Sequence, residues 1–302
     1  MVIKENGAVN TMEAVKINTK EKERTKVTYH KSVFSSVLTG ITWGAAILAL
    51  AVLVFLVGFI LIRGVKNLTL EQFAWTYNTE NVTMLPAIIN TVTMTVLSLL
   101  LAAPLGIFSA IYLVEYANKR GKLVGLIRIT AETLSGIPSI VYGLFGMLFF
   151  TKTLKMGYSM MSGACTLAIM ILPLIMRTAE EALKSVPDSY REASFGLGAG
   201  KLRTIFKIVL PAAVPGILSG VILATGRIVG ETAALIYTAG SVAKIPSSVF
   251  SSGRTLAVHM YLLANEGLHV NQAYATAVIL LILVIAINAL SSFIAKKITK
   301  AQ

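Results

Sequence analysis

Long apolar stretches separated by short polar segments make up most of the chain beyond residue 32. A helix that crosses a bilayer needs about 20 mostly apolar residues. Six stretches reach about that length, and each predicts a membrane-spanning helix. We therefore expect an all-α, polytopic membrane protein. The six predicted spans are residues 37–62, 81–114, 124–150, 156–176, 210–238 and 272–295.

The lysine and arginine residues fall mainly on one side of these spans. With the N-terminus inside, twenty of the 27 basic residues lie in cytoplasmic segments and six in external ones. Basic residues are enriched in cytoplasmic loops, so both termini are predicted to be cytoplasmic. Most of the net charge of +13 is then explained by the basic residues that orient the spans in the membrane, and binding of nucleic acid is not expected.

Composition supports the same class of protein. Only 14% of residues are charged, whereas soluble domains carry about 25%. The single cysteine, Cys165, excludes an internal disulfide. Residues 1–31, mixed in charge and poor in aromatic residues, are predicted to form a flexible cytoplasmic tail outside a transmembrane domain of residues 32–302.

Three charged residues lie well inside predicted spans: Arg227 and Glu231 in the fifth, and Glu132 in the third, one turn beyond Arg128 at its cytoplasmic edge. Each costs about 3 kcal/mol in hydrocarbon, so it must face a partner or a wet cavity. Four residues apart, Arg227 and Glu231 are expected to share one helix face near mid-membrane. Either Arg227 lines an anion path with Glu231 orienting it, or the two form a structural ion pair. Glu132 is the third candidate for the substrate pathway, and it is either solvated at the interface or paired with Arg227.

Glycine and proline predict where the spans bend and pack. Pro138, two residues after Gly136, should kink or interrupt the third span. In the fifth span, the glycine pairs 216/220 and 226/230 have the four-residue spacing that lets helix backbones approach closely.

The cytoplasmic loop 177–207 is predicted to hold two short helices. Pro187 and Asp188 favour a helix start, and Gly198 and Gly200 favour its end. A second helix should follow until Pro211 and Pro215 interrupt it. The run GLGAGKL does not meet the phosphate-binding-loop pattern, because Phe195 and Leu202 occupy required positions. No nucleotide or other cofactor is therefore expected on this chain.

This loop also carries a spaced pattern. Glu192, Ala193 and Ser194 are followed after three residues by Gly198, and nine residues later by Ile-x-Leu-Pro at 208–211. The pattern resembles the EAA loop of permease subunits in bacterial ABC importers, with Ser194 in place of the second alanine. The resemblance implies the ABC importer permease fold and a loop that docks on an ATPase subunit.

Two further runs, ETLSGIPSIVYGLFG at 132–146 and GRIVGETAALIYTAG at 226–240, resemble the phosphate-specific branch of these permeases. The second is more similar to PstA-type than to PstC-type subunits. The resemblance implies a phosphate importer subunit in a bacterial inner or plasma membrane, with no enzymatic activity of its own. Its implied partners are a PstC-like permease, PstB-like ATPases that hold the ATP, a PstS-like external phosphate-binding protein and membrane lipid.

Two alternatives stay open. One is a permease for another oxyanion, such as molybdate or sulfate. The other is an integral-membrane phosphoesterase, which needs convergent acids, histidines or a nucleophile near one membrane face. The spans hold only Glu132, Arg227 and Glu231 for such chemistry. His259 and His269 lie ten residues apart without a nearby acid or thiol cluster, so no metal site is expected.

Overall fold

The computed structural model describes residues 33–78, 80–118 and 121–300, with side chains described from residue 34 to residue 297 within these ranges. These residues form helices and connecting segments without a strand, which confirms the all-α prediction. The predicted tail of residues 1–31 lies outside the described residues. The elements are α2 (Val33–Lys66), η1 (Leu70–Phe73), α3 (Leu85–Ile111), η2 (Tyr112–Tyr116), α4 (Lys122–Ser135), α5 (Ser139–Gly146), η3 (Met147–Thr153), α6 (Met160–Lys184), α7 (Asp188–Gly196), α8 (Lys201–Thr204), η4 (Ile205–Val209), α9 (Leu210–Val229), α10 (Ala233–Ile236), α11 (Leu256–Glu266) and α12 (Val270–Lys300).

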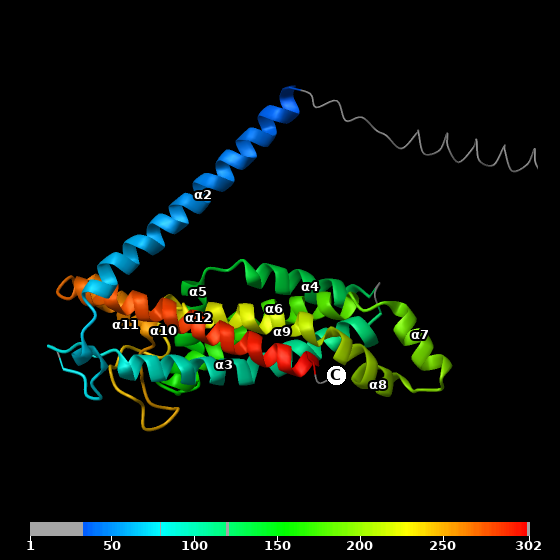
Figure 1. Ribbon diagram of the computed structural model, residues 1–302. Helices are drawn as coiled ribbons and strands as arrows, with labels where there is room; N and C mark the ends of the chain where they lie inside the picture. Colours follow the sequence, from blue (N-terminus) through cyan, green and yellow to red (C-terminus); the bar gives the residue numbers. More distant parts are fainter. Residues whose placement is uncertain (1–32, 79, 119–120, 301–302) are drawn as a thin grey trace, which may run out of the picture. The chain divides into compact units, whose positions relative to one another are not determined.

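Among the described residues, five helices are long and apolar enough to cross a membrane. The bent pair formed by α4 and the α5–η3 segment makes up to six if it counts as one span. This confirms the prediction of about six spans. Helices α7 and α8 lie at one end of the bundle and α11 at the other (Figure 1), as expected for cytoplasmic and external segments.

Contacts divide the chain into two compact units, Met1–Val57 and Gly58–Gln302. In the first unit, the described residues 34–56 of α2 are all exposed and mostly apolar, a composition suited to lipid. The last turns of α2 belong to the second unit. There, Phe59 packs edge-on against Tyr274 of α12, with 5.8 Å between ring centroids.

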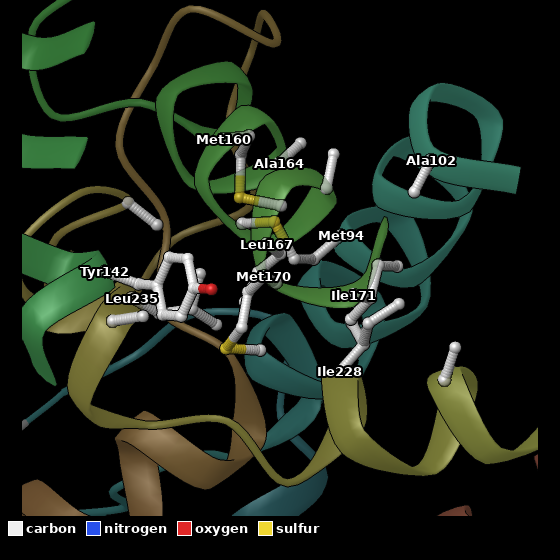
Figure 2. Close-up of a cluster of buried hydrophobic side chains, with 14 of the residues drawn as sticks. Met94, Ala102, Tyr142, Met160, Ala164, Leu167, Met170, Ile171, Ile228 and Leu235 are labelled. Carbon is white, nitrogen blue, oxygen red and sulfur yellow. The ribbon is translucent and has the colours of Figure 1, made fainter. Parts of the chain in front are cut away.

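Helix α6 is the centre of the second unit. In its most apolar stretch 67% of residues are buried, against 33% or less in the other four spans. Its side chains pack between α3 and α9, where Met94, Met170 and Ile228 belong to one core cluster (Figure 2). Because α6 is covered on several sides, its neighbours are positioned against it.

Glycine sets the distance between α6 and α9. A Cβ atom at Gly216 would lie 2.6 Å from Ala182 Cβ, and one at Gly220 would lie 2.6 Å from Thr178 Cβ. The predicted close packing of this pair is confirmed. The same prediction for the second pair is wrong, because a Cβ at Gly226 would meet no atom within 4 Å and one at Gly230 would meet only Gly226 O at 3.7 Å.

The expected interruption at Pro211 and Pro215 is also wrong, since the helix runs on from Lys201 to Val229. The turn before Pro211 is a π-helix, and the Leu210 N–H bonds to Ile205 O. A proline ring normally clashes with the carbonyl four residues earlier. The wider π turn gives the ring room, so the loop helix and the fifth span form one rod.

Replacing Gly220 by alanine should destabilise the chain, whereas replacing Gly226 should not. The new methyl at 220 meets Thr178, and overpacking of this kind costs about 1–3 kcal/mol. The methyl at 226 meets open space and raises helix propensity by up to about 1 kcal/mol. Thermal unfolding of the purified chain in detergent measures both. Equal shifts for the two variants would contradict the assigned packing.

Candidate functional site

Two spans are interrupted. Helix α4 ends at Ser135, α5 begins at Ser139 after Pro138, and the two axes meet at 102°. This confirms the predicted effect of Pro138. Helix α9 ends at Val229 and α10 begins only at Ala233. The predicted continuous fifth span to residue 238 is therefore wrong.

The two interruptions are joined by direct packing of the helices that follow them. A Cβ at Gly143 of α5 would lie 2.8 Å from Ala234 Cα of α10. A Cβ at Gly146 would meet Thr166 of α6 and lie 2.8 Å from Thr238 Cγ2. Only glycine permits this approach, which brings α5 and α10 together against α6.

Glu231 lies in the second interruption and not on a helix face. It is 8% exposed, and its Oε1 accepts a hydrogen bond of 3.1 Å from the Ala234 N–H. The carboxylate thus satisfies an amide at the start of α10 that has no partner within the helix. The expected pairing along one helix face is wrong, because Gly230 ends α9 before Glu231 is reached.

Arg227 lies in the last turn of α9 and is half-buried. Within the described part of the chain, it forms no ion pair with Glu231 or with any other acid. Its guanidinium interacts electrostatically with Tyr142 of α5. The Tyr142 hydroxyl donates a 2.7 Å hydrogen bond to Leu134 O and so bridges the first interruption. A guanidinium without an acid partner among the described residues therefore lies just before the second interruption, and its charge acts on the tyrosine that bridges the first.

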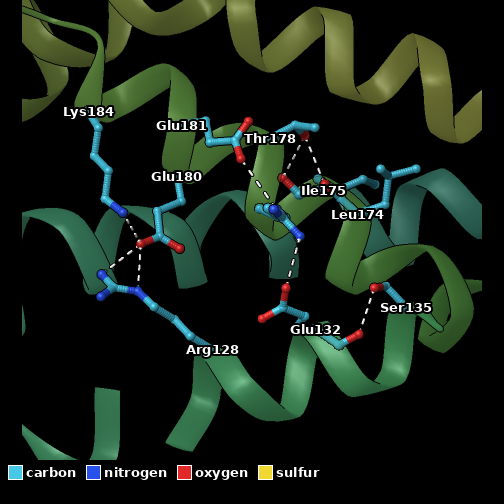
Figure 3. A network of polar contacts seen from close by, with 10 residues as sticks. Arg128, Glu132, Ser135, Leu174, Ile175, Thr178, Glu180, Glu181 and Lys184 are labelled. Atoms are coloured by element: carbon cyan, nitrogen blue, oxygen red, sulfur yellow. Dashed lines mark hydrogen bonds and ion pairs between the residues drawn. The ribbon is translucent and has the colours of Figure 1, made fainter. Parts of the chain in front are cut away.

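Glu132 lies elsewhere, on the wall of a cavity of about 620 Å³ between α4 and α6. Its carboxylate is 3.8 Å from Arg177, and the proposed pairing with Arg227 is not formed. Deeper in the network, Glu180 accepts from Arg128 at 2.7 Å and Lys184 at 2.6 Å (Figure 3). The acids and bases in this wall balance one another, so the cavity is polar without a strong excess of either charge.

The loop with the EAA-like pattern forms the short helix that was predicted. Pro187 precedes α7 and Asp188 begins it. The helix ends in a Schellman motif: Gly198, at φ +80°, donates to Phe195 O and Ala199 donates to Ser194 O. Glu192 and Ala193 are exposed, whereas Ser194 is buried and hydrogen-bonded to Thr204 of α8 at 2.8 Å.

Arg191, which the sequence did not single out, anchors α7 to the bundle. Its Nε and Nη2 donate to Glu115 Oε1 at 3.1 and 2.7 Å. Nη1 donates to Val186 O, just after α6, and Nη2 donates also to Leu183 O in its last turn. The side chains of Arg191 and Glu115 are only 15% and 9% exposed. The only signal in the sequence was that Arg191 directly precedes Glu192.

Replacing Glu115 by leucine should destabilise the chain by about 3 kcal/mol, since breaking a buried ion pair leaves an uncompensated charge. Replacing Asp188 by asparagine is the matched control. Asp188 also contacts Arg191, but its side chain is 82% exposed, and such pairs contribute about 0–1 kcal/mol. Thermal unfolding in detergent compares the variants. A loss at Asp188 as large as at Glu115 would show that Glu115 does not anchor α7.

Comparisons with known proteins agree on one family. Residues 102–301 match the family described as binding-protein-dependent transport system inner membrane component. The chain is 33% identical to the phosphate transport system permease protein PstA 1 of Mycobacterium tuberculosis, over 89% of this chain and 90% of the relative. It is 32% identical to the probable ABC transporter permease protein YqgI of Bacillus subtilis, over 79% and 86%.

Solved structures share the fold at lower identity. A subunit of a bacterial alginate ABC transporter superposes with a TM-score of 0.61, at 16% identity over 89% of this chain and 95% of that one. A chain of the MetNI methionine ABC transporter superposes with a TM-score of 0.55, at 19% identity over 80% and 97%. The expected ABC importer permease fold is confirmed.

Proposed function

Because this chain belongs to the family of binding-protein-dependent transport system inner membrane components, we propose that it is the PstA-type permease subunit of an ATP-driven importer for inorganic phosphate. Several relatives that carry the name of phosphate transport permeases align over most of its length, which supports phosphate over molybdate or sulfate. A phosphoesterase has no comparable support. As a multi-pass protein with this ancestry, the chain would reside in the inner or plasma membrane of a bacterium.

The observation that carries the proposal is the guanidinium of Arg227, which has no acid partner among the described residues and lies in the last turn of α9, just before the second interruption. Discontinuous helices are a common way for transporters to build substrate sites inside a membrane. Guanidinium presents planar, paired N–H donors that suit two phosphate oxygens, and it stays positively charged at physiological pH. The Glu231 carboxylate accepts the Ala234 N–H at the start of α10 and does not pair with Arg227. The positive charge of Arg227 is therefore left uncompensated by the described acids and can attract an anion.

The same proposal assigns α7 to an ATPase. Its Glu192 and Ala193 are exposed at the end of the bundle, where a partner would contact them. ATP would bind and be hydrolysed on PstB-like subunits and not on this chain. A PstC-like second permease and a PstS-like external phosphate-binding protein would complete the importer, which has no role for nucleic acid.

Replacing Arg227 by alanine should reduce phosphate uptake at least tenfold, and replacement by lysine should give an intermediate rate, because lysine keeps the charge but loses the paired donors. Uptake of radioactive phosphate into vesicles with the assembled importer measures both. Alanine at the exposed Arg63 of α2 is the control and should leave uptake unchanged. Near-normal transport in both Arg227 variants, at normal assembly, would refute the role of Arg227.

Replacing Glu192 by lysine or Gly198 by aspartate should release the ATPase subunit from the purified complex. The first change reverses an exposed charge, and the second strains a backbone at φ +80° that holds the end of α7. Glu266→Lys and Gly157→Asp are matched controls, since Gly157 also has a positive φ of +64° but lies outside α7. Copurification is the measurement. Full ATPase retention in both α7 variants would exclude this docking role.

A further inference from the structure

The end of the bundle opposite α7 contains a buried arginine. Arg254 is 6% exposed, and it precedes Thr255 and α11. Its Nε and Nη2 atoms have no hydrogen-bond partner, and neither has the Thr255 hydroxyl nor either ring nitrogen of His259. Thr255 is 2% exposed and His259 is fully buried. Buried polar groups almost always have a partner, so this group of unpartnered polar atoms points to a missing one.

The unpartnered nitrogens of Arg254, Nε and Nη2, form one edge of its guanidinium, and this edge indicates what kind of partner would fit. Arg191 and Arg128 both use Nε and Nη2 to hold a carboxylate, Glu115 and Glu180 respectively. In Arg254 the same two nitrogens face no acid among the described residues. This edge carries two parallel N–H groups, which bind two oxygens of a carboxylate or phosphate.

The face of the same guanidinium is occupied. Its Cζ lies 4.7 Å from the centre of the Tyr77 ring, a cation–π contact. Tyr77 also packs edge-on against His259, with 6.4 Å between ring centroids. One aromatic ring therefore touches both residues, and Arg254 lies beside the first turn of α11. Stacking on a ring leaves the in-plane N–H groups free for another partner.

The backbone around Arg254 is held in place. Its N–H donates to Val242 O at 3.0 Å, and its carbonyl accepts from Asn90 Nδ2 at 3.1 Å. The next amide but one, Leu256, donates to Thr91 Oγ1 at 2.8 Å. The open donors thus sit on a rigid frame tied to α3, which lowers the entropy lost on binding a ligand.

His259 adds a neutral group to this frame. Burial, and secondarily the charge of Arg254, lower its pKa to about 3, so the imidazole is uncharged at neutral pH. The backbone of Val82 acts in the opposite direction and raises the pKa of His259, although neither ring nitrogen forms a hydrogen bond with it. A neutral imidazole has one N–H donor and one nitrogen that accepts. An accepting nitrogen suits an anion that still carries a proton.

We propose that Arg254, Thr255 and His259 form a second oxyanion site, at the external end of the bundle, that binds hydrogen phosphate. Arg254 would hold two phosphate oxygens through Nε and Nη2, and Thr255 would donate to the bound anion. A buried, unpaired ion costs several kcal/mol, and a water molecule does not neutralise its charge, whereas an anion does. The choice of phosphate rests on the proposed function; the presence of an oxyanion site rests on the geometry alone.

The test measures phosphate binding to the full chain in lipid nanodiscs by equilibrium dialysis with radioactive inorganic phosphate. Arg227→Gln is present in every sample, so that the proposed pathway residue does not contribute. This background should bind one phosphate per chain. Adding Arg254→Gln should weaken binding at least tenfold, whereas adding Arg63→Gln, at an exposed arginine, should leave it unchanged.

Thr255→Val tests the site with a smaller change, and it decides the outcome if the Arg254 variant does not fold. It keeps the shape of the side chain and should weaken binding severalfold, because only the hydroxyl is lost. Sulfate, which has no proton to donate at neutral pH, should compete at least tenfold less well than phosphate.

Three results would overturn the proposal: no phosphate binding in the Arg227→Gln background, unchanged affinity after Arg254→Gln or Thr255→Val, or equal competition by sulfate. None of these readouts involves uptake by the assembled importer. A failure here is therefore distinguishable from a failure of the proposed transport function.

Discussion

Backbone groups released at a helix interruption must find partners inside the protein, because the hydrocarbon of a membrane offers none. This constraint organises the centre of the chain. The Tyr142 hydroxyl bonds Leu134 O across the first interruption, and the Glu231 carboxylate accepts the Ala234 N–H at the second. Gly143 then lets α5 lie directly on α10. Tyr142 and Glu231 thus supply partners at the two interruptions, and Arg227, just before the second, is left without an acid partner among the described residues.

Four arginines fall into two groups, those paired with a carboxylate and those without an acid partner among the described residues. Arg128 and Arg191 direct the Nε–Nη2 edge at a carboxylate and join one helix to another. Arg227 and Arg254 have no acid partner among the described residues. The paired arginines are structural joints, since their charge is already compensated. The unpaired ones keep a charge that no acid of the described residues compensates, and for this reason they carry the two anion-binding proposals.

The connection between α7 and Arg227 follows from one uninterrupted rod. Ser194 of α7 bonds Thr204 of α8, and α8 continues through η4 into α9, which ends two residues after Arg227. Arg191 and Glu115 tie the same loop to the ends of α3 and α6. A displacement of α7 would therefore reach Arg227 along a single helix instead of through a chain of side-chain contacts. The π turn at Ile205–Val209 makes this possible by accommodating Pro211.

By itself, the sequence determined the features that depend on neighbouring residues: the number of spans, the bend at Pro138 and the α7 helix with its Gly198 stop. It also carried the spaced pattern that identified the family. It missed features that depend on residues distant in the chain, namely the Arg191–Glu115 pair and the Tyr77–Arg254 contact. Spacing along the chain wrongly joined Arg227 to Glu231 in one helix. Tertiary packing of α5 on α10 accompanies the end of α9 at Val229, which places Glu231 outside that helix. A helix ends where its amides and carbonyls find partners outside the helix, and distant residues supply those partners.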